Sequence, residues 1–333
     1  SIAGVETSKF NNIIINEIKK KDPRIQLSLN KIKIKFDIKK IQIYLSTTDP
    51  QIIFQGIQIP IKEINLYTKI ISILKSKNEI NRVITSFENF KINDIQKLST
   101  RIKPSNFKTY LLNNLNNGEI ERILVDINLD ENLNISDYKL NGSAKKVNVK
   151  VSNNMLIQDV SFNFISDKKL TLINSLNANY HGILVSSGSL SIKRDKQINV
   201  EGQFNSKFNL KEDSINKLFI KSDIKFLEKN KVNIRSSLIN NFSLKINENF
   251  KLIDYNYNSE GNILDSYIVL KNNFKSKYFE SPIKKFLIPQ ANLTISLNKN
   301  NNNILTLDGL YNLGRTENKK FKISYDLSKK IPK

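Results

Sequence analysis

Apolar and polar residues alternate along much of the chain, most regularly from about residue 119 to the end. Ile123, Val125, Ile127 and Leu129 are each separated by one residue, and several later runs repeat this spacing. Because successive side chains of a β-strand point to opposite faces, the period of two predicts strands with one apolar and one polar face. We expect residues 119–333 to form a repetitive antiparallel β segment, with turns built from Asn, Asp, Ser and Lys.

Residues 1–118 combine strand and helix patterns. Lys31, Lys33 and Lys35 alternate with apolar residues, which predicts a strand that meets water on one face only. Apolar spacings typical of amphipathic helices occur at residues 10–18, 66–74, 95–102 and 107–115. We therefore expect an α+β region over residues 1–118.

The fold class that these patterns predict is mainly β. We expect an elongated, twisted antiparallel sheet that curls into an open apolar groove, with a few amphipathic helices in the N-terminal third. A long sheet with one apolar face must bury that face. A closed sandwich core, a dimer and a lipid-filled trough are three ways to do so, and the pattern alone leaves all three open.

The charge of the chain suggests a polyanion as partner, but its composition argues against nucleic acid. The 333 residues carry 53 Lys and Arg against 31 Asp and Glu, a net charge of +22. Seven of the basic residues are Arg, and the lysines are spread along the strands instead of clustering with aromatic residues. Nucleic-acid binders gather Arg and Lys on one face, so we expect no nucleic-acid partner, and attraction to an anionic membrane surface is favoured over it.

Candidate catalytic and metal-binding residues are few. The chain has no Cys and a single His, His181, which excludes thiol chemistry, disulfides and His-rich metal centres. Asp126, Asn128 and Asp130 have the first spacings of a calcium loop, but a glutamate stands where that loop needs glycine, so a strand is favoured. Gly182 and Gly188 are interpreted as hairpin turns, with His181 in the first. We expect no enzymatic activity, no cofactor and no metal site.

Several segments resemble the AsmA-like family of bacterial envelope proteins, which is similar to the chorein-type bridge-like lipid transfer proteins of eukaryotes. The resemblance covers most of the chain and consists of patterns of residue type. The segments that carry it are GVET (4–7), LSTTDPQI (45–52), IKEI (61–64), YTKIISILKSK (67–77), EINRVI (79–84), LNGS (140–143), FNF (162–164) and GSLSI (188–192).

The resemblance implies a location and a function. Family members have an inner-membrane anchor and a periplasmic body, and they pass phospholipid toward the outer membrane in outer-membrane biogenesis. The chain contains no run of 18 apolar residues and begins with Ser1, so we expect a fragment that lacks the N-terminal membrane helix. Its expected partners are phospholipid acyl chains, the inner membrane through that missing helix, and other envelope proteins.

The apolar positions of the expected groove are the candidate site. The residues that we expect to line it are Ile32, Ile34, Phe36, Ile41, Ile43, Leu45, Phe162, Phe164, Phe204 and Phe208. Two alternatives remain open: a secreted or envelope structural or adhesive β-protein with a closed dry core, and a polyanion-binding β-domain that uses its lysine faces.

Overall fold

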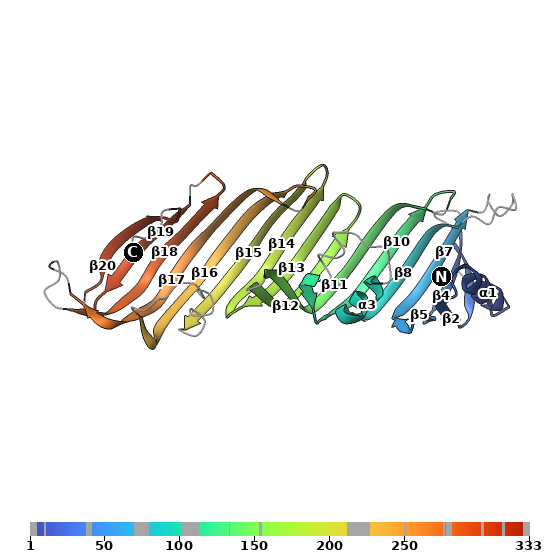
Figure 1. Ribbon diagram of the computed structural model, residues 1–333, viewed down its shortest axis with the longest axis horizontal. Coiled ribbons are helices and arrows are strands. Elements are labelled where there is room, and N and C mark those ends of the chain that lie inside the picture. The colour runs from blue at the N-terminus through green and yellow to red at the C-terminus, as the bar shows by residue number, and fades with distance from the viewer. Residues whose placement is uncertain are drawn as a thin grey trace. The chain divides into compact units, whose positions relative to one another are not determined.

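A computed structural model shows a chain built mainly from β-strands (Figure 1). The strands form one large antiparallel sheet, and Ile25–Ser28 (β2), Gln51–Phe54 (β5) and Ile57–Ile59 (β6) form a separate three-stranded sheet. The mainly β, antiparallel part of the expected fold is therefore confirmed. The structure describes residues 5–9, 11–37, 42–69, 80–100, 113–132, 134–152, 155–211, 227–249, 251–275, 277, 282–300, 303–314 and 317–328.

The chain divides into two compact units, Ser1–Thr171 and Leu172–Lys333. The change of sequence pattern near residue 118 falls within the first unit. The division into regions 1–118 and 119–333 describes that pattern and stays a prediction.

In the first unit, eight strands of the large sheet pair in the order β1, β3, β4, β7, β8, β10, β11, β12, each antiparallel to the next, and β9 pairs with β11. Their bounds are Val5–Thr7 (β1), Ile32–Asp37 (β3), Gln42–Thr48 (β4), Ile61–Lys69 (β7), Ile80–Lys91 (β8), Leu115–Asn116 (β9), Glu119–Leu129 (β10), Ile135–Ser152 (β11) and Met155–Ser166 (β12).

The helix expected at residues 66–74 is wrong over the part that the structure describes. Leu66 and Thr68 lie in β7, which is hydrogen-bonded to β4 on one edge and to β8 on the other. The same residues fit a period of two, because Ile64, Leu66 and Thr68 alternate with Asn65 and Tyr67. Pairing on both edges outweighs the helical spacing, and residues 70–74 lie outside the described residues.

Helices α1 (Asn11–Lys21) and α3 (Ile92–Ser99) occur where the sequence pattern has two of its helical spacings. The Asn11 side chain of α1 donates hydrogen bonds to the carbonyl oxygens of Leu29 and Asn30, which fixes this helix beside the end of β2. Most of the helix expected at residues 107–115 lies outside the described residues, and its last position, Leu115, belongs to β9.

In the second unit, seven strands pair in chain order, each antiparallel to the next. They are Ile183–Arg194 (β14), Ile198–Lys211 (β15), Leu227–Ile246 (β16), Leu252–Phe274 (β17), Ile283–Asn298 (β18), Ile304–Asn312 (β19) and Lys319–Asp326 (β20). Leu170–Tyr180 (β13) precedes them and spans the division between the units.

Bulges and glycines bend the strands of each unit. Lys146 in β11 and Ser187 in β14 have φ values of 52° at points where the pairing register shifts. A Cβ atom on Gly261 of β17 would lie 2.0 Å from the carbonyl oxygen of Ser237, so only glycine fits where these two strands approach. Bulges and glycine kinks are the devices that curve a sheet.

The turn expected at Gly188 is wrong, because this residue lies inside β14, next to the bulge at Ser187. Its lack of a side chain has a packing reason, since a Cβ there would come within 2.8 Å of Leu176. Gly182, with φ of +90°, does lie in the turn between β13 and β14, beside His181.

Candidate functional site

The strand register of the first unit collects apolar side chains on one face of the sheet. Residues directly opposite each other in an antiparallel pair point to the same face. Ile34 is opposite Leu45, and Leu45 is opposite Leu66 on the next strand. The same line continues through Val83 to Ile127. We call this side of the sheet in each unit the apolar face, and the other side the outer face.

Seven of the expected lining residues lie on the apolar face of the first unit. Five come from β3 and β4, where Phe36 is opposite Ile43 and Ile34 is opposite Leu45. Phe162 and Phe164 come from β12, with ring centroids 6.1 Å apart. Gly142 of β11 is opposite Phe164 and continues the line to Ile123. Ile41 lies outside the described residues.

These side chains are only partly withdrawn from water. Ile32 is 3% exposed, but the other six described lining residues of this unit are half-buried. Large apolar side chains in a closed core are usually fully buried. In the first unit the apolar face therefore keeps aliphatic and aromatic surface that a ligand could cover.

In the second unit, Phe204 and Phe208 lie on the apolar face of β15. Phe204 is opposite Asn240, and its ring meets that of Phe242 edge-on at 6.2 Å. Phe208 packs against a cluster of four buried side chains from three strands. The cluster consists of Leu238, Ile263, Ala291 and Leu293.

A polar network is buried among these apolar residues. The amide nitrogen of Asn240, which is 1% exposed, donates to the Phe204 carbonyl oxygen at 3.1 Å and to Ser206 Oγ at 3.0 Å. Its amide oxygen accepts from Tyr257 Oη at 2.8 Å and from Ser259 Oγ at 2.9 Å. Burial raises the pKa of Tyr257. Sequence patterns did not predict this network, because its members come from three strands.

The outer face of β16 is mostly polar. Along β16, Arg235, Ser237, Ile239 and Asn241 are exposed, whereas the residues between them are buried. Ile239 is the apolar residue among these four. It is 45% exposed and has polar neighbours on both sides along the strand. The two faces of this unit thus differ in chemistry as the period of two predicts.

The lysines of β3 belong to the outer face. Lys33 is opposite Glu6 and forms an ion pair with it at 2.8 Å, while Lys31 contacts the same carboxylate at 3.4 Å. The hydrogen bond from Lys33 lowers the pKa of Glu6. Lys35 lies over the ring of Tyr44 at 5.7 Å. Part of the positive charge of this strand is therefore used in local contacts.

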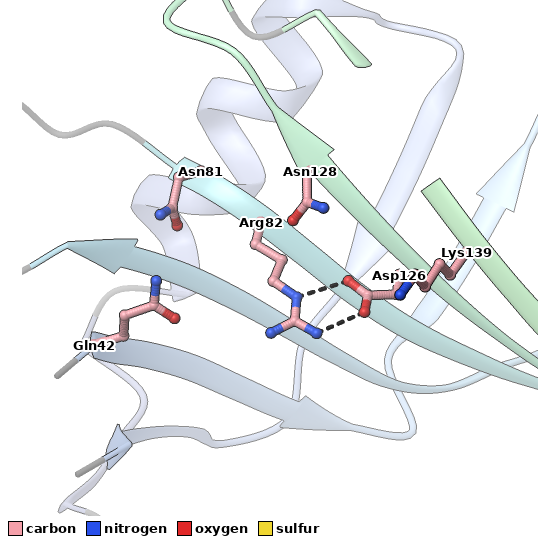
Figure 2. A pocket seen from close by; sticks show the side chains of 6 residues that line it. All are labelled: Gln42, Asn81, Arg82, Asp126, Asn128 and Lys139. Carbon is pink, nitrogen blue, oxygen red and sulfur yellow. Dashed lines mark hydrogen bonds and ion pairs between the residues drawn. The ribbon is translucent and has the colours of Figure 1, made fainter. Parts of the chain in front are cut away.

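The other candidates from the sequence have structural roles. Asp126 and Asn128 lie in β10, and Asp126 accepts two hydrogen bonds from Arg82 (Figure 2), so the calcium-loop spacing belongs to a strand. His181 stands in a turn with its ring 4.7 Å from that of Tyr180. Within the described ranges, no three His, Cys, Asp or Glu residues are grouped to hold a metal ion. No described helix combines the length and apolarity needed to cross a bilayer.

Comparisons with protein-family models, curated proteins and solved structures gave no match to this chain.

Proposed function

We propose that the chain binds phospholipid acyl chains on its apolar face, curled into a groove, and lets them pass along it. The observation that supports this most is the row of half-buried apolar side chains in the first unit, in register over neighbouring strands. The outer face carries polar and charged residues, so water solvates one side of the sheet while the other offers an apolar path.

Energetics favour such a path for lipid. Each methylene moved from water into apolar surroundings gains about 0.8 kcal/mol. A sixteen-carbon tail therefore needs on the order of 12 kcal/mol of compensation to leave a bilayer. A continuous apolar face supplies that compensation at each step, while the headgroup stays in water at the open side.

The setting that we propose follows from the resemblance to AsmA-like envelope proteins. In it, the protein is periplasmic, held at the inner membrane by a helix outside this sequence, and carries phospholipid toward the outer membrane. The bends at the glycines and bulges are consistent with a curled sheet, because they curve the strands locally.

The alternative is a structural or adhesive protein with a dry core, and the buried cluster around Leu238 in the second unit favours it there. The polyanion-binding alternative has less support, since basic and acidic side chains are interleaved on the outer face of that unit. The basic ones include Lys207, Arg235, Lys245 and Lys322, and the acidic ones Glu201, Asp254, Glu260 and Asp308.

A matched pair of neighbouring substitutions tests the proposal. Phe164→Asp places a carboxylate on the apolar face, and Asn163→Asp places the same charge one residue away on the exposed outer face. Phospholipid that co-purifies with the protein is quantified by mass spectrometry beside thermal unfolding. We expect lipid in the wild type and in Asn163→Asp, and its loss in Phe164→Asp with the fold retained.

A dry core predicts a different outcome. The wild type would then carry no phospholipid, and Phe164→Asp would lose its cooperative unfolding transition, because an unpaired charge would be buried. Transfer of a fluorescent phospholipid between donor and acceptor vesicles measures passage directly. Binding without accelerated transfer would contradict passage while leaving binding intact.

A further inference from the structure

The last strand of the second unit, β20, offers one edge for pairing. It is hydrogen-bonded to β19 from Lys319 to Tyr311 at one end and from Asp326 to Ile304 at the other. Among the described residues of this unit, no strand pairs with the other edge of β20. Figure 1 shows β20 in red after β18 and β19. A strand edge of this kind presents a row of N–H and C=O groups on which another strand can pair.

The apolar face of the second unit ends at this edge with an exposed side chain. Leu293, Leu307 and Ile323 lie opposite one another in a line from β18 to β20. Leu293 is 8% exposed, whereas Ile323, at the end of the line, is 52% exposed. Side chains on one face of a sheet are covered by those directly opposite on both neighbouring strands. A further strand beside β20 would therefore cover Ile323.

The charges on β20 restrict which strand can pair with it. Lys320 and Lys322 are exposed on the outer face. Lysines on a strand edge normally oppose pairing, because like charges would lie side by side. A partner strand must place a carboxylate or a neutral side chain opposite them. Asp326 lies on the same face of the same strand, and its carboxylate, which accepts from Ser328, can accept further hydrogen bonds.

A second copy of β20, running antiparallel, meets this requirement. When Ile323 lies opposite Ile323 of the second copy, Phe321 is opposite Tyr325 and Lys320 is opposite Asp326. Because the arrangement is symmetric, the last two pairs each occur twice. Apolar residues then meet on one face, and opposite charges meet on the other.

Neighbouring registers fit less well. Centring the pair on Lys322 would place this lysine opposite itself. Centring it on Ser324 would pair only residues 322–326 of β20, whereas centring it on Ile323 pairs residues 320–326.

We propose that two copies of this chain associate edge to edge through β20, so that the sheet of the second unit continues from one copy into the other. The apolar faces of the two copies then join on one side. The inference depends on strand register and charge and does not require lipid binding, so it can fail or hold independently of the proposed function.

Sedimentation velocity of the whole chain over a range of concentrations tests the proposal. We expect a reversible dimer with a dissociation constant on the order of 10 µM. Lys320→Glu places two carboxylates opposite each other at two points and should weaken dimerisation about tenfold. Adding Asp326→Lys reverses both charges and should restore most of the affinity. Lys207→Glu, on the exposed outer face of β15, is the control and should dimerise like the wild type.

Three outcomes of this experiment would overturn the proposal. The first is a monomer at every concentration, and the second is assembly into species larger than a dimer. The third is a double variant that dimerises no better than Lys320→Glu alone.

Cross-linking tests whether the contact runs through β20. The chain has no Cys, so Ile323→Cys introduces the only thiol. Directly opposite Cβ atoms of an antiparallel pair lie about 5 Å apart, so a short bismaleimide should join two copies of this variant. Leu184→Cys, at a residue 56% exposed on the outer face of β14, should stay monomeric. Equal cross-linking of the two variants would contradict pairing through β20.

Discussion

The apolar faces of the two units are filled in different ways. In the second unit, Leu238, Ile263 and Leu293 are each below 9% exposed and touch one another across three strands. In the first unit the larger lining residues, such as Phe36 and Phe164, remain half-buried. Phe204 and Phe208 of the second unit are half-buried as well. Because burying apolar area gains roughly 25 cal/mol per Å², a lipid would gain from covering the rings of either unit, and the contrast between the units lies in the closed cluster around Leu238.

Buried polar groups on the two apolar faces differ in whether they have hydrogen-bond partners. In the second unit, the amide nitrogen of Asn240 donates to Ser206, and its amide oxygen accepts from Tyr257 and Ser259. Among the described residues of the first unit, the buried hydroxyls of Thr47 and Thr85, both opposite Ile64, have no hydrogen-bond partner. A buried polar group is thus paired at Asn240 in the second unit, whereas the first unit buries two hydroxyls at a cost of about 1–3 kcal/mol each.

The largest effect should come from the same charge placed on each face. Leu238→Asp buries a carboxylate in the cluster of the second unit, where Leu238 is 6% exposed. We expect a loss of more than about 4 kcal/mol in the free energy of unfolding. Phe164→Asp in the first unit should cost only about 1–2 kcal/mol, because its carboxylate can reach water. Denaturant unfolding followed by circular dichroism measures both. Equal losses would show that the two faces are closed alike.

Removing the centre of the buried network should have the next largest effect. Asn240→Ala leaves the hydroxyls of Ser206, Tyr257 and Ser259 without this partner and opens a small cavity. We expect a loss of about 2–4 kcal/mol. Asn241→Ala, at the exposed neighbouring position, should change stability by less than about 0.5 kcal/mol. Urea unfolding of the two variants gives the comparison, and a similar small cost for both would mean that the network contributes little.

Sequence patterns predicted local features better than contacts between distant strands. The alternation in β10 indicated that Ile123, Val125 and Ile127 share a face, because it depends only on neighbours in the chain. The strand β7 was mistaken for a helix, since the spacing of Leu66 and its apolar neighbours fits both periods and pairing with β4 and β8 decides between them. Arg82 and Asp126 are 44 residues apart, so no local pattern could join them. For Asp126, the calcium-like spacing was the only signal, and it indicated the wrong chemistry.

Replacing a buried hydroxyl of the first unit by an apolar group should raise the free energy of unfolding, whereas the substitutions above lower it. Thr85→Val puts a methyl group of similar size in place of a buried hydroxyl that has no hydrogen-bond partner in the part of the chain that the structure describes. We expect a gain of about 1 kcal/mol in the free energy of unfolding of the lipid-free protein. Thr294→Val, on the exposed outer face of β18, serves as control and should have little effect. A loss of stability on Thr85→Val would show that this hydroxyl has a partner inside the fold.

The smallest effect should be the removal of one donor from the Asn240 network. In Tyr257→Phe, Ser259 still donates to the Asn240 oxygen, so the loss near neutral pH should be at most about 1 kcal/mol. Burial raises the pKa of Tyr257 above its unfolded value of about 10. A raised pKa stabilises the fold below pH 10, and this contribution is lost as the pH rises through the folded pKa. The wild type should therefore lose this contribution above pH 10, and its difference in stability from Tyr257→Phe should shrink. The other tyrosines titrate in both proteins, so their effects cancel in the comparison. Urea unfolding at pH 7 and above pH 10 measures this difference. A gap that stays constant would show that burial does not raise the pKa of Tyr257 in the folded protein.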